Sequence, residues 1–113
     1  MLHQLIYLSH ATKLYSDAEL VRILEKSRSN NARLWITGLL LYHEGSVIQV
    51  LEGENDTVHS LYKRICHDSR HGGIILLIDG AIERRSFPDW SLGFRQLSAD
   101  DLSKLHPSAR DRR

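Results

Sequence analysis

The sequence predicts an α+β domain built from two successive strand–helix–strand units. Strand-like segments with alternating or continuous apolar residues flank two segments whose apolar residues fall at helical spacing. Short turn signals separate these segments. This order is the split βαβ arrangement of the ferredoxin-like fold, βαββαβ, with a four-stranded antiparallel sheet and both helices on one face. Right-handed crossovers place the first and third strands side by side at its centre.

The first half of the chain supplies one such unit and a hairpin. Leu2–Ser9 is the first strand, and Ser16-Asp17-Ala18-Glu19 is a capping-box pattern that opens a helix. Asn30-Asn31 is expected to end this helix. Leu34–Tyr42 is the second strand, and Glu44-Gly45 is a two-residue hairpin turn.

The second half begins with the third strand and a helix capped by Asn55 or Asp56. The further expected elements are strands at Ser46–Glu52, Ile74–Ile82 and Trp90–Leu97, and a short helix at Asp100–Leu105. The run Ile-Ile-Leu-Leu-Ile predicts that the fourth strand is buried on both faces. Trp90 and Leu92, two residues apart, are expected to share one face of the fifth strand.

Composition limits the class of protein. A chain of 113 residues with 42% hydrophobic and 26% charged residues is typical of one globular domain. The net charge of +1 gives no basic surface for nucleic acid, and no apolar stretch approaches a membrane span. The lone Cys66 and the absence of a secretory signal favour the cytoplasm. No acyl-transfer triad, paired carboxylates or phosphate loop appears, so a non-enzymatic function is expected.

Three polar residues stand where apolar ones are expected. Gln49 interrupts the strand Val47–Leu51, Tyr7 lies in Leu5–Leu8, and Asn31 ends the first helix. Buried polar groups of this kind cost a few kcal/mol unless they are paired. They suggest a planar ligand rich in hydrogen-bonding edges. The alternative is a core tyrosine bonded to a core glutamine, with no ligand.

Strand register tests whether these residues can meet. With Glu44-Gly45 as the turn, Leu40 pairs with Gln49, and their shared face is expected to be the one that the helices cover. A loop one residue longer would reverse this assignment. Tyr7 on the neighbouring strand can point to the same gap. Gly38 is expected to leave room there for a ligand. Trp35, Leu39 and Leu41 then face the opposite side, where a C-terminal helix or a homodimer partner is expected to cover them.

Polar residues after the second helix have two interpretations. Cys66, His67 and His71 do not form a recognised zinc spacing, so no metal site is predicted. Arg64, Asp68, Arg70 and His71 either complement the helix end as surface charges or hold the polar chain of a nucleotide-like ligand.

An ordered set of motifs resembles the BLUF family, the bacterial sensors of blue light using FAD. The motifs are Leu5-Ile6-Tyr7-Leu8-Ser9, Asn30-Asn31-Ala32-Arg33, Ile36-Thr37-Gly38-Leu39-Leu40-Leu41-Tyr42, Gln49-Val50-Leu51-Glu52-Gly53, Asp68-Ser69-Arg70-His71 and Arg84-Arg85-Ser86-Phe87-Pro88-Asp89-Trp90-Ser91. The resemblance implies a BLUF flavin-binding domain over residues 1–98, followed by a C-terminal helix and charged tail over 99–113. The implied cofactor is noncovalent FAD, which FMN or riboflavin can replace in recombinant material.

The resemblance also implies residue roles. Tyr7 is the electron and proton donor to the photoexcited flavin, and Gln49 is the switch between Tyr7 and the flavin N5/C4-carbonyl edge. Asn31 holds the C4-carbonyl and N3 edge. The residues expected near the other carbonyl and the ribityl chain are Arg64, Asp68 and His71.

The output positions are implied as well. Trp90 matches a Trp that moves when the signal passes to the last strand, and Leu92 stands where the family usually has Met. The signal is expected to leave through a downstream protein partner or a second copy of the chain, with no direct contact to nucleic acid or membrane. The alternative is a light-inactive flavin-binding or ferredoxin-like interaction module, because Leu lacks the thioether of Met.

Overall fold

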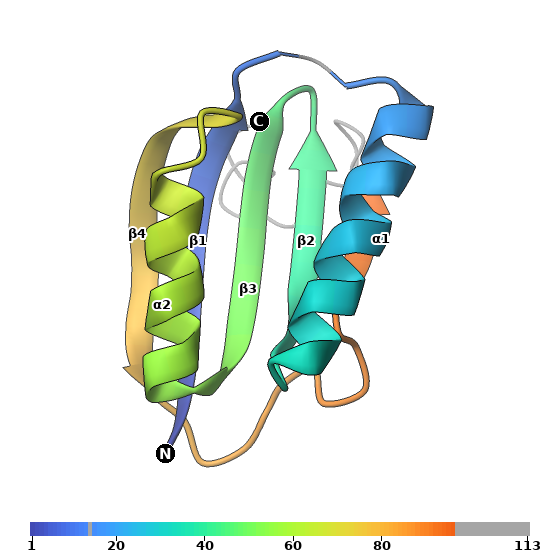
Figure 1. Cartoon of the computed structure of the whole chain (residues 1–113). Helices are drawn as coiled ribbons and strands as arrows, with labels where there is room; N and C mark the ends of the chain where they lie inside the picture. The colour runs from blue at the N-terminus through green and yellow to red at the C-terminus, as the bar shows by residue number, and fades with distance from the viewer. Residues whose placement is uncertain (14, 97–113) are drawn as a thin grey trace, which may run out of the picture.

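The computed structural model describes residues 1–13 and 15–96 of the chain. It contains five strands and two helices among these residues (Figure 1). Their bounds are β1 Leu2–Ala11, α1 Asp17–Arg33, β2 Thr37–His43, β3 Ser46–Glu54, α2 Asn55–Cys66, β4 His71–Ala81 and β5 Gly93–Gln96.

The strands form one sheet in the order β4-β1-β3-β2-β5. The first four pair antiparallel, and β5 adds to β2 in parallel. Helices α1 and α2 both lie over one face of this sheet, α2 toward β1 and β4 and α1 toward β2 (Figure 1). The predicted ferredoxin-like arrangement, with the first and third strands adjacent at the centre and an additional fifth strand, is confirmed.

Helix α1 begins where the sequence predicted but ends later. The Glu19 N–H donates to Ser16 Oγ at 3.2 Å, and the Ser16 N–H donates to Glu19 Oε1 at 3.1 Å, which completes a capping box. The bond from the Ser16 backbone lowers the pKa of Glu19 to about 2. Asn30 and Asn31 do not end the helix, since asparagine disfavours a helix interior only weakly. The chain reverses instead at Trp35, which has φ 58°.

Replacing Ser16 by alanine should lower the free energy of unfolding by about 1 kcal/mol, because the first turn of α1 loses the acceptor for an otherwise unpaired N–H. Urea unfolding followed by circular dichroism measures this change. Ser60→Ala, an exposed position inside α2, is the matched control and should change stability much less. Equal loss in the two variants would show that the cap contributes nothing.

The hairpin has the predicted turn and register. Glu44 and Gly45 both have positive φ, 45° and 89°, as a tight two-residue hairpin requires. Leu40 pairs with Gln49, and Tyr42 pairs with Val47. The side chains predicted to share the helix-covered face therefore do share it.

Gly38 is needed for a different reason than the one predicted. A Cβ atom at this position would lie 1.8 Å from the carbonyl oxygen of Val50 on β3. The Gly38 N–H donates to the Trp90 carbonyl at 2.9 Å on its other side. Neighbouring backbone, rather than the approach of a ligand, requires glycine there.

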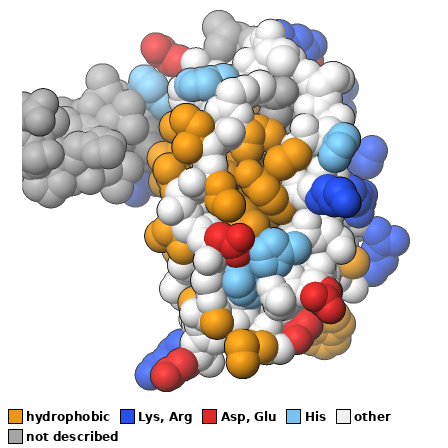
Figure 2. All heavy atoms as spheres, turned by 90° about the vertical axis from the view of Figure 1, so that its left-hand side faces the viewer, with side chains coloured by type: hydrophobic (Ala, Val, Ile, Leu, Met, Phe, Trp, Pro, Cys, Tyr) orange, Lys and Arg blue, Asp and Glu red, His pale blue; other side chains and the backbone are white. Residues whose placement is uncertain are grey.

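The prediction that the fourth strand is buried on both faces is wrong. β4 is an edge strand, and its only neighbour among the described strands is β1. Ile75, Leu76, Leu77 and Ile78 are therefore 43 to 54% exposed. Figure 2 shows apolar side chains gathered on this side of the molecule.

Two other boundaries differ from the prediction. Glu54, rather than Asn55 or Asp56, is the N-cap residue of α2, and its side chain makes no capping bond. The predicted fifth strand is shorter, because residues before Gly93 form an irregular segment. Trp90 and Leu92 precede the strand and do not share an environment, since Trp90 is 51% exposed and Leu92 is 3% exposed.

The predicted short helix Asp100–Leu105 and the charged tail lie outside the described residues. Among the described residues, neither helix is both long and apolar enough to cross a membrane. The main core lies between β1, β3 and α2, and it is formed by Leu5, Tyr7, Ile36, Leu51, Val58 and Leu61. This core fixes α2 against the centre of the sheet and leaves the space toward α1 for the site.

Candidate functional site

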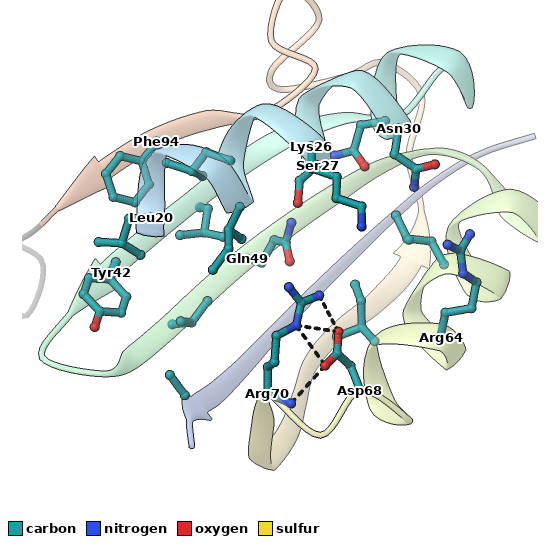
Figure 3. A pocket seen from close by; sticks show the side chains of 18 of the residues that line it. Leu20, Lys26, Ser27, Asn30, Tyr42, Gln49, Arg64, Asp68, Arg70 and Phe94 are labelled. Atoms are coloured by element: carbon teal, nitrogen blue, oxygen red, sulfur yellow. Dashed lines mark hydrogen bonds and ion pairs between the residues drawn. The ribbon is translucent and has the colours of Figure 1, made fainter. Parts of the chain in front are cut away.

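A cavity of about 670 Å³ lies between the two helices and the sheet. Its apolar wall includes Leu20, Leu24, Leu40, Val47, Leu61 and Ile65. Figure 3 shows Gln49 projecting from β3 into the space between α1 and the Asp68–Arg70 pair. The size and the mixed lining are those of a site for a cofactor or another small molecule.

Tyr7 and Gln49 form the centre of the cavity floor. They are direct partners on the adjacent strands β1 and β3, and the Tyr7 hydroxyl donates a hydrogen bond to Gln49 Oε1. Tyr7 is fully buried and Gln49 is 7% exposed. Burial raises the pKa of the Tyr7 phenol, so the hydroxyl keeps its proton and remains a donor. The amide nitrogen of Gln49 is then the group that can donate toward a ligand.

Tyr62 packs against this pair from α2. The centroids of the Tyr7 and Tyr62 rings lie 5.5 Å apart at an interplanar angle of 51°. Burial, with a hydrogen bond to Cys66, raises the pKa of Tyr62 to about 12. Two neutral phenols therefore stand side by side, but only Tyr7 reaches Gln49.

Asn31 reaches the cavity because α1 continues through its last turn. Its side chain is 3% exposed, and Nδ2 donates to the Ser91 carbonyl at 2.9 Å. Asn31 also lines the cavity. One carboxamide thus touches both the cavity and the segment that leads to β5.

The cavity rim beyond α2 is charged. Arg64 and Asp68 both line it. The Arg70 guanidinium donates a bidentate pair of hydrogen bonds to the Asp68 carboxylate, with Nη2 2.6 Å from Oδ2 and Nε 3.0 Å from Oδ1. These bonds raise the pKa of the Arg70 guanidinium. His71 begins β4, and its side chain falls outside the described part of the structure.

The structure adds residues that the predicted site lacked. Arg70 lines the cavity, although the family resemblance did not place it among the flavin-binding residues. Lys26, Ser27 and Asn30 on α1 also line it, as Figure 3 shows. Lys26 and Ser27 lie three and four residues after Ile23, and Asn30 lies four and three residues after them, so helical spacing in the sequence already places these residues on one face.

Trp90 and Leu92 do not line the cavity. Trp90 stacks on Phe87, with ring centroids 5.8 Å apart. The Leu92 side chain is buried, and its carbonyl accepts a bond of 2.8 Å from Arg28 Nε. Both residues lie in the segment next to the bond from Asn31 to Ser91.

The cavity has the features of a cofactor-binding pocket. The Tyr7–Gln49 bond is what a core pair without ligand would also show, but a core pair does not require a cavity beside it. Here the cavity offers apolar walls for a flat ring, amide groups for its polar edge and a charged rim for a polar chain. The residues present therefore fit a flavin nucleotide.

Comparison with known proteins identifies the family. Residues 2–93 match the BLUF family, described as sensors of blue-light using FAD. The chain is 38% identical over 89 residues to the photoactivated adenylate cyclase subunit beta of Euglena longa, covering 78% of this chain and 10% of that protein. It is 35% identical over 86 residues to the blue light- and temperature-regulated antirepressor BluF of Escherichia coli strain K12, covering 75% of this chain and 21% of that protein.

Solved structures agree. A bacterial light-regulated adenylyl cyclase superposes with a TM-score of 0.85 at 37% identity, covering 98% of this chain and 33% of that one. The BLUF protein BlrB in its dark state superposes with a TM-score of 0.82 at 34% identity, covering 97% of this chain and 82% of that one. The chain belongs to the BLUF family and is a blue-light sensor module that uses FAD. It spans about a tenth of the length of the photoactivated cyclase relatives.

Proposed function

We propose that FAD binds noncovalently in the cavity between α1 and α2, with the polar edge of its ring system toward Gln49 and Asn31. The observation that carries this proposal is the convergence of three buried polar side chains, Tyr7, Gln49 and Asn31, on one cavity. The ribityl chain and the more distant polar groups of FAD would be held by Arg64, Asp68, Arg70 and His71. Gly38 stays outside the binding residues, because its contacts are backbone contacts.

Bound FAD supplies blue-light absorption and an oxidising excited state. Tyr7 supplies an electron and the hydroxyl proton, which the Gln49 carboxamide relays from its position within hydrogen-bond contact. The two ends of a carboxamide have opposite hydrogen-bonding character, so a change in the state of Gln49 exchanges a donor for an acceptor. The altered contact of Gln49 would persist after both the electron and the proton have returned to Tyr7, and this contact would be the signal.

The signal leaves through residues 90–92. Asn31 binds the Ser91 carbonyl, Arg28 binds the Leu92 carbonyl, and the Gly38 N–H binds the Trp90 carbonyl. A change at Asn31 would therefore act on the backbone that enters β5. Trp90 and Leu92 are the side chains proposed to respond. Leu92 in place of Met keeps bulk and loses flexibility, which affects lit-state stability and output rather than flavin binding.

The cofactor proposal has a direct test. Purified protein should be yellow, and denaturation should release a flavin that chromatography identifies as FAD. A colourless preparation that takes up no added FAD, FMN or riboflavin would contradict the proposal and leave the ferredoxin-like interaction module. Bound flavin with no response to light would favour the light-inactive alternative, which the Leu92 substitution motivates.

The proposed output is non-enzymatic and passes to a protein effector. Named relatives are cyclases and an antirepressor, so the effector differs among proteins that share this module.

We place the sensor domain at 1–98 and a separate C-terminal helix and tail at 99–113. A cytoplasmic location remains a prediction, supported by the lone Cys66.

A homodimer is the proposed assembly, and the face of the sheet opposite the helices is its surface. Strand register puts Ile6, Leu8, Leu39, Leu41 and Ile48 on this face. Trp35, beside it, is 82% exposed, and Ile75 and Ile78 on β4 are about half exposed. Contiguous apolar area of this kind marks an interaction surface.

The double substitution of Ile75 and Ile78 by lysine should shift the chain toward monomer, because two charges would enter the apolar interface. Sedimentation velocity of the flavin-loaded protein in darkness and under blue light measures the shift. Val21→Lys, at a residue that is 52% exposed on α1, is the control and should leave the assembly unchanged. A wild-type monomer at high concentration in both conditions would remove the dimer proposal.

A further inference from the structure

A second cluster of functional side chains lies away from the flavin cavity. His3 on β1, His59 on α2 and Asp79 on β4 bring their ligand atoms within 4.8 Å of one another. None of the three lines the flavin cavity. The side of the molecule drawn in Figure 2 carries histidine side chains next to an acidic one. The centroids of the His3 and His59 rings lie 4.7 Å apart.

Both imidazole rings direct the same atom toward the same oxygen. His59 Nε2 lies 2.9 Å from Asp79 Oδ1, and His3 Nε2 contacts that oxygen as well. The three side chains are 14%, 41% and 36% exposed in the order His3, His59, Asp79, so a dissolved ion can reach them. Two imidazole nitrogens and a carboxylate from three separate elements therefore converge on one accessible point.

The hydrogen bond of His59 Nδ1 determines whether Nε2 of a neutral ring is a donor or an acceptor. His59 Nδ1 lies 2.9 Å from the Asn55 carbonyl oxygen. A carbonyl oxygen only accepts, so Nδ1 carries the hydrogen. In a neutral ring Nε2 then presents its lone pair to the Asp79 carboxylate, so this contact needs either a proton on Nε2 or a metal cation between the two groups. A backbone carbonyl that orients a histidine in this way is a usual outer partner in metal sites.

We propose that His3 Nε2, His59 Nε2 and the Asp79 carboxylate bind a divalent first-row transition metal ion, for which zinc is the natural probe. Imidazole nitrogen and carboxylate oxygen are ligands that zinc accepts, and three protein ligands leave room for water. This site is separate from the flavin proposal, and neither depends on the other.

The ion would act as a clamp on the fold. It would tie α2 to β1 and β4, joining residues that are 76 and 20 positions apart in the chain. A ligand that binds the folded but not the unfolded chain stabilises the folded state. Because α2 also carries Tyr62, which packs on Tyr7, the clamp would hold one wall of the flavin cavity.

Zinc titration of the untagged, flavin-loaded protein by calorimetry tests the proposal. We expect one zinc ion per chain and a melting temperature raised by about 5 °C or more at saturation. His59→Gln and Asp79→Asn should each weaken binding by at least about tenfold. His67→Gln is the matched control, because His67 Nδ1 makes the same bond, 2.8 Å to the Lys63 carbonyl, outside the cluster.

Circular dichroism and flavin absorption establish that each variant is folded, and His3→Gln replaces any variant that is not. Unchanged zinc affinity in two folded cluster variants would overturn the proposal. So would an equal loss in His67→Gln, which would place the ion elsewhere. The absence of both binding heat and a melting shift in the wild-type protein would leave a hydrogen-bonded ion-pair cluster only.

Discussion

Tyr7→Phe and Gln49→Leu should each retain FAD and lose the reversible red shift that blue light produces in the wild-type protein. Phenylalanine keeps the ring that packs on Tyr62 but removes the hydroxyl, which is the donor to Gln49 Oε1. Leucine keeps an apolar shape that β3 accepts and removes both ends of the carboxamide. The light response should fall to the detection limit in both variants, because each removes one half of the same hydrogen-bonded pair.

Tyr62→Phe is the matched control for this experiment. It removes a neighbouring phenol that packs on Tyr7 and whose partner is Cys66, not Gln49. The red shift should persist in it. Absorption spectra in darkness, under blue light and after recovery measure all three variants at equal flavin content. A normal red shift in Tyr7→Phe or Gln49→Leu would show that the switch is assigned to the wrong residues.

Gly38→Ala should destabilise the fold by roughly 3 kcal/mol or more, because the added methyl group would meet the Val50 carbonyl oxygen at 1.8 Å. Backbone in the middle of the sheet cannot move aside as a flexible side chain can. The Gly38 N–H also binds the Trp90 carbonyl, so any shift of β2 disturbs the segment before β5. A melting temperature lower by on the order of 10 °C is expected.

Gly80→Ala on β4 provides the comparison, since a Cβ there has no neighbouring atom within 4 Å. The two variants make the same chemical change in the same sheet, so intrinsic differences between glycine and alanine cancel. Thermal unfolding of both, monitored by circular dichroism and by flavin release, separates close packing from strand propensity. Equal melting temperatures would show that the contact with Val50 is relieved at little cost.

The arrangement at the centre of the sheet could be predicted from the sequence. Glu44-Gly45 fixes the hairpin, and a side-chain period of two then fixes which face Leu40 and Gln49 occupy. Tyr7 follows because the order of the elements sets β1 beside β3. These steps need only turn chemistry, alternation and the handedness of crossovers.

The parts that sequence reasoning missed depend on tertiary neighbours. The apolar run of β4 has the composition of a buried strand, but its edge position leaves Ile75 about half exposed. Gly38 has the same sequence signal whether a ligand or a backbone lies above it. The bond from Asn31 to Ser91 and the meeting of His59 with Asp79 join elements that no local pattern relates.

The absorption spectrum of the wild-type chain loaded with FAD, recorded in darkness and after blue light, tests the central claim most directly. The Tyr7–Gln49 pair beside the cavity predicts a red shift of the flavin bands that decays completely in darkness, with no covalent adduct. A flavin-loaded protein with identical dark and illuminated spectra would contradict the claim that this pair is a light-driven switch.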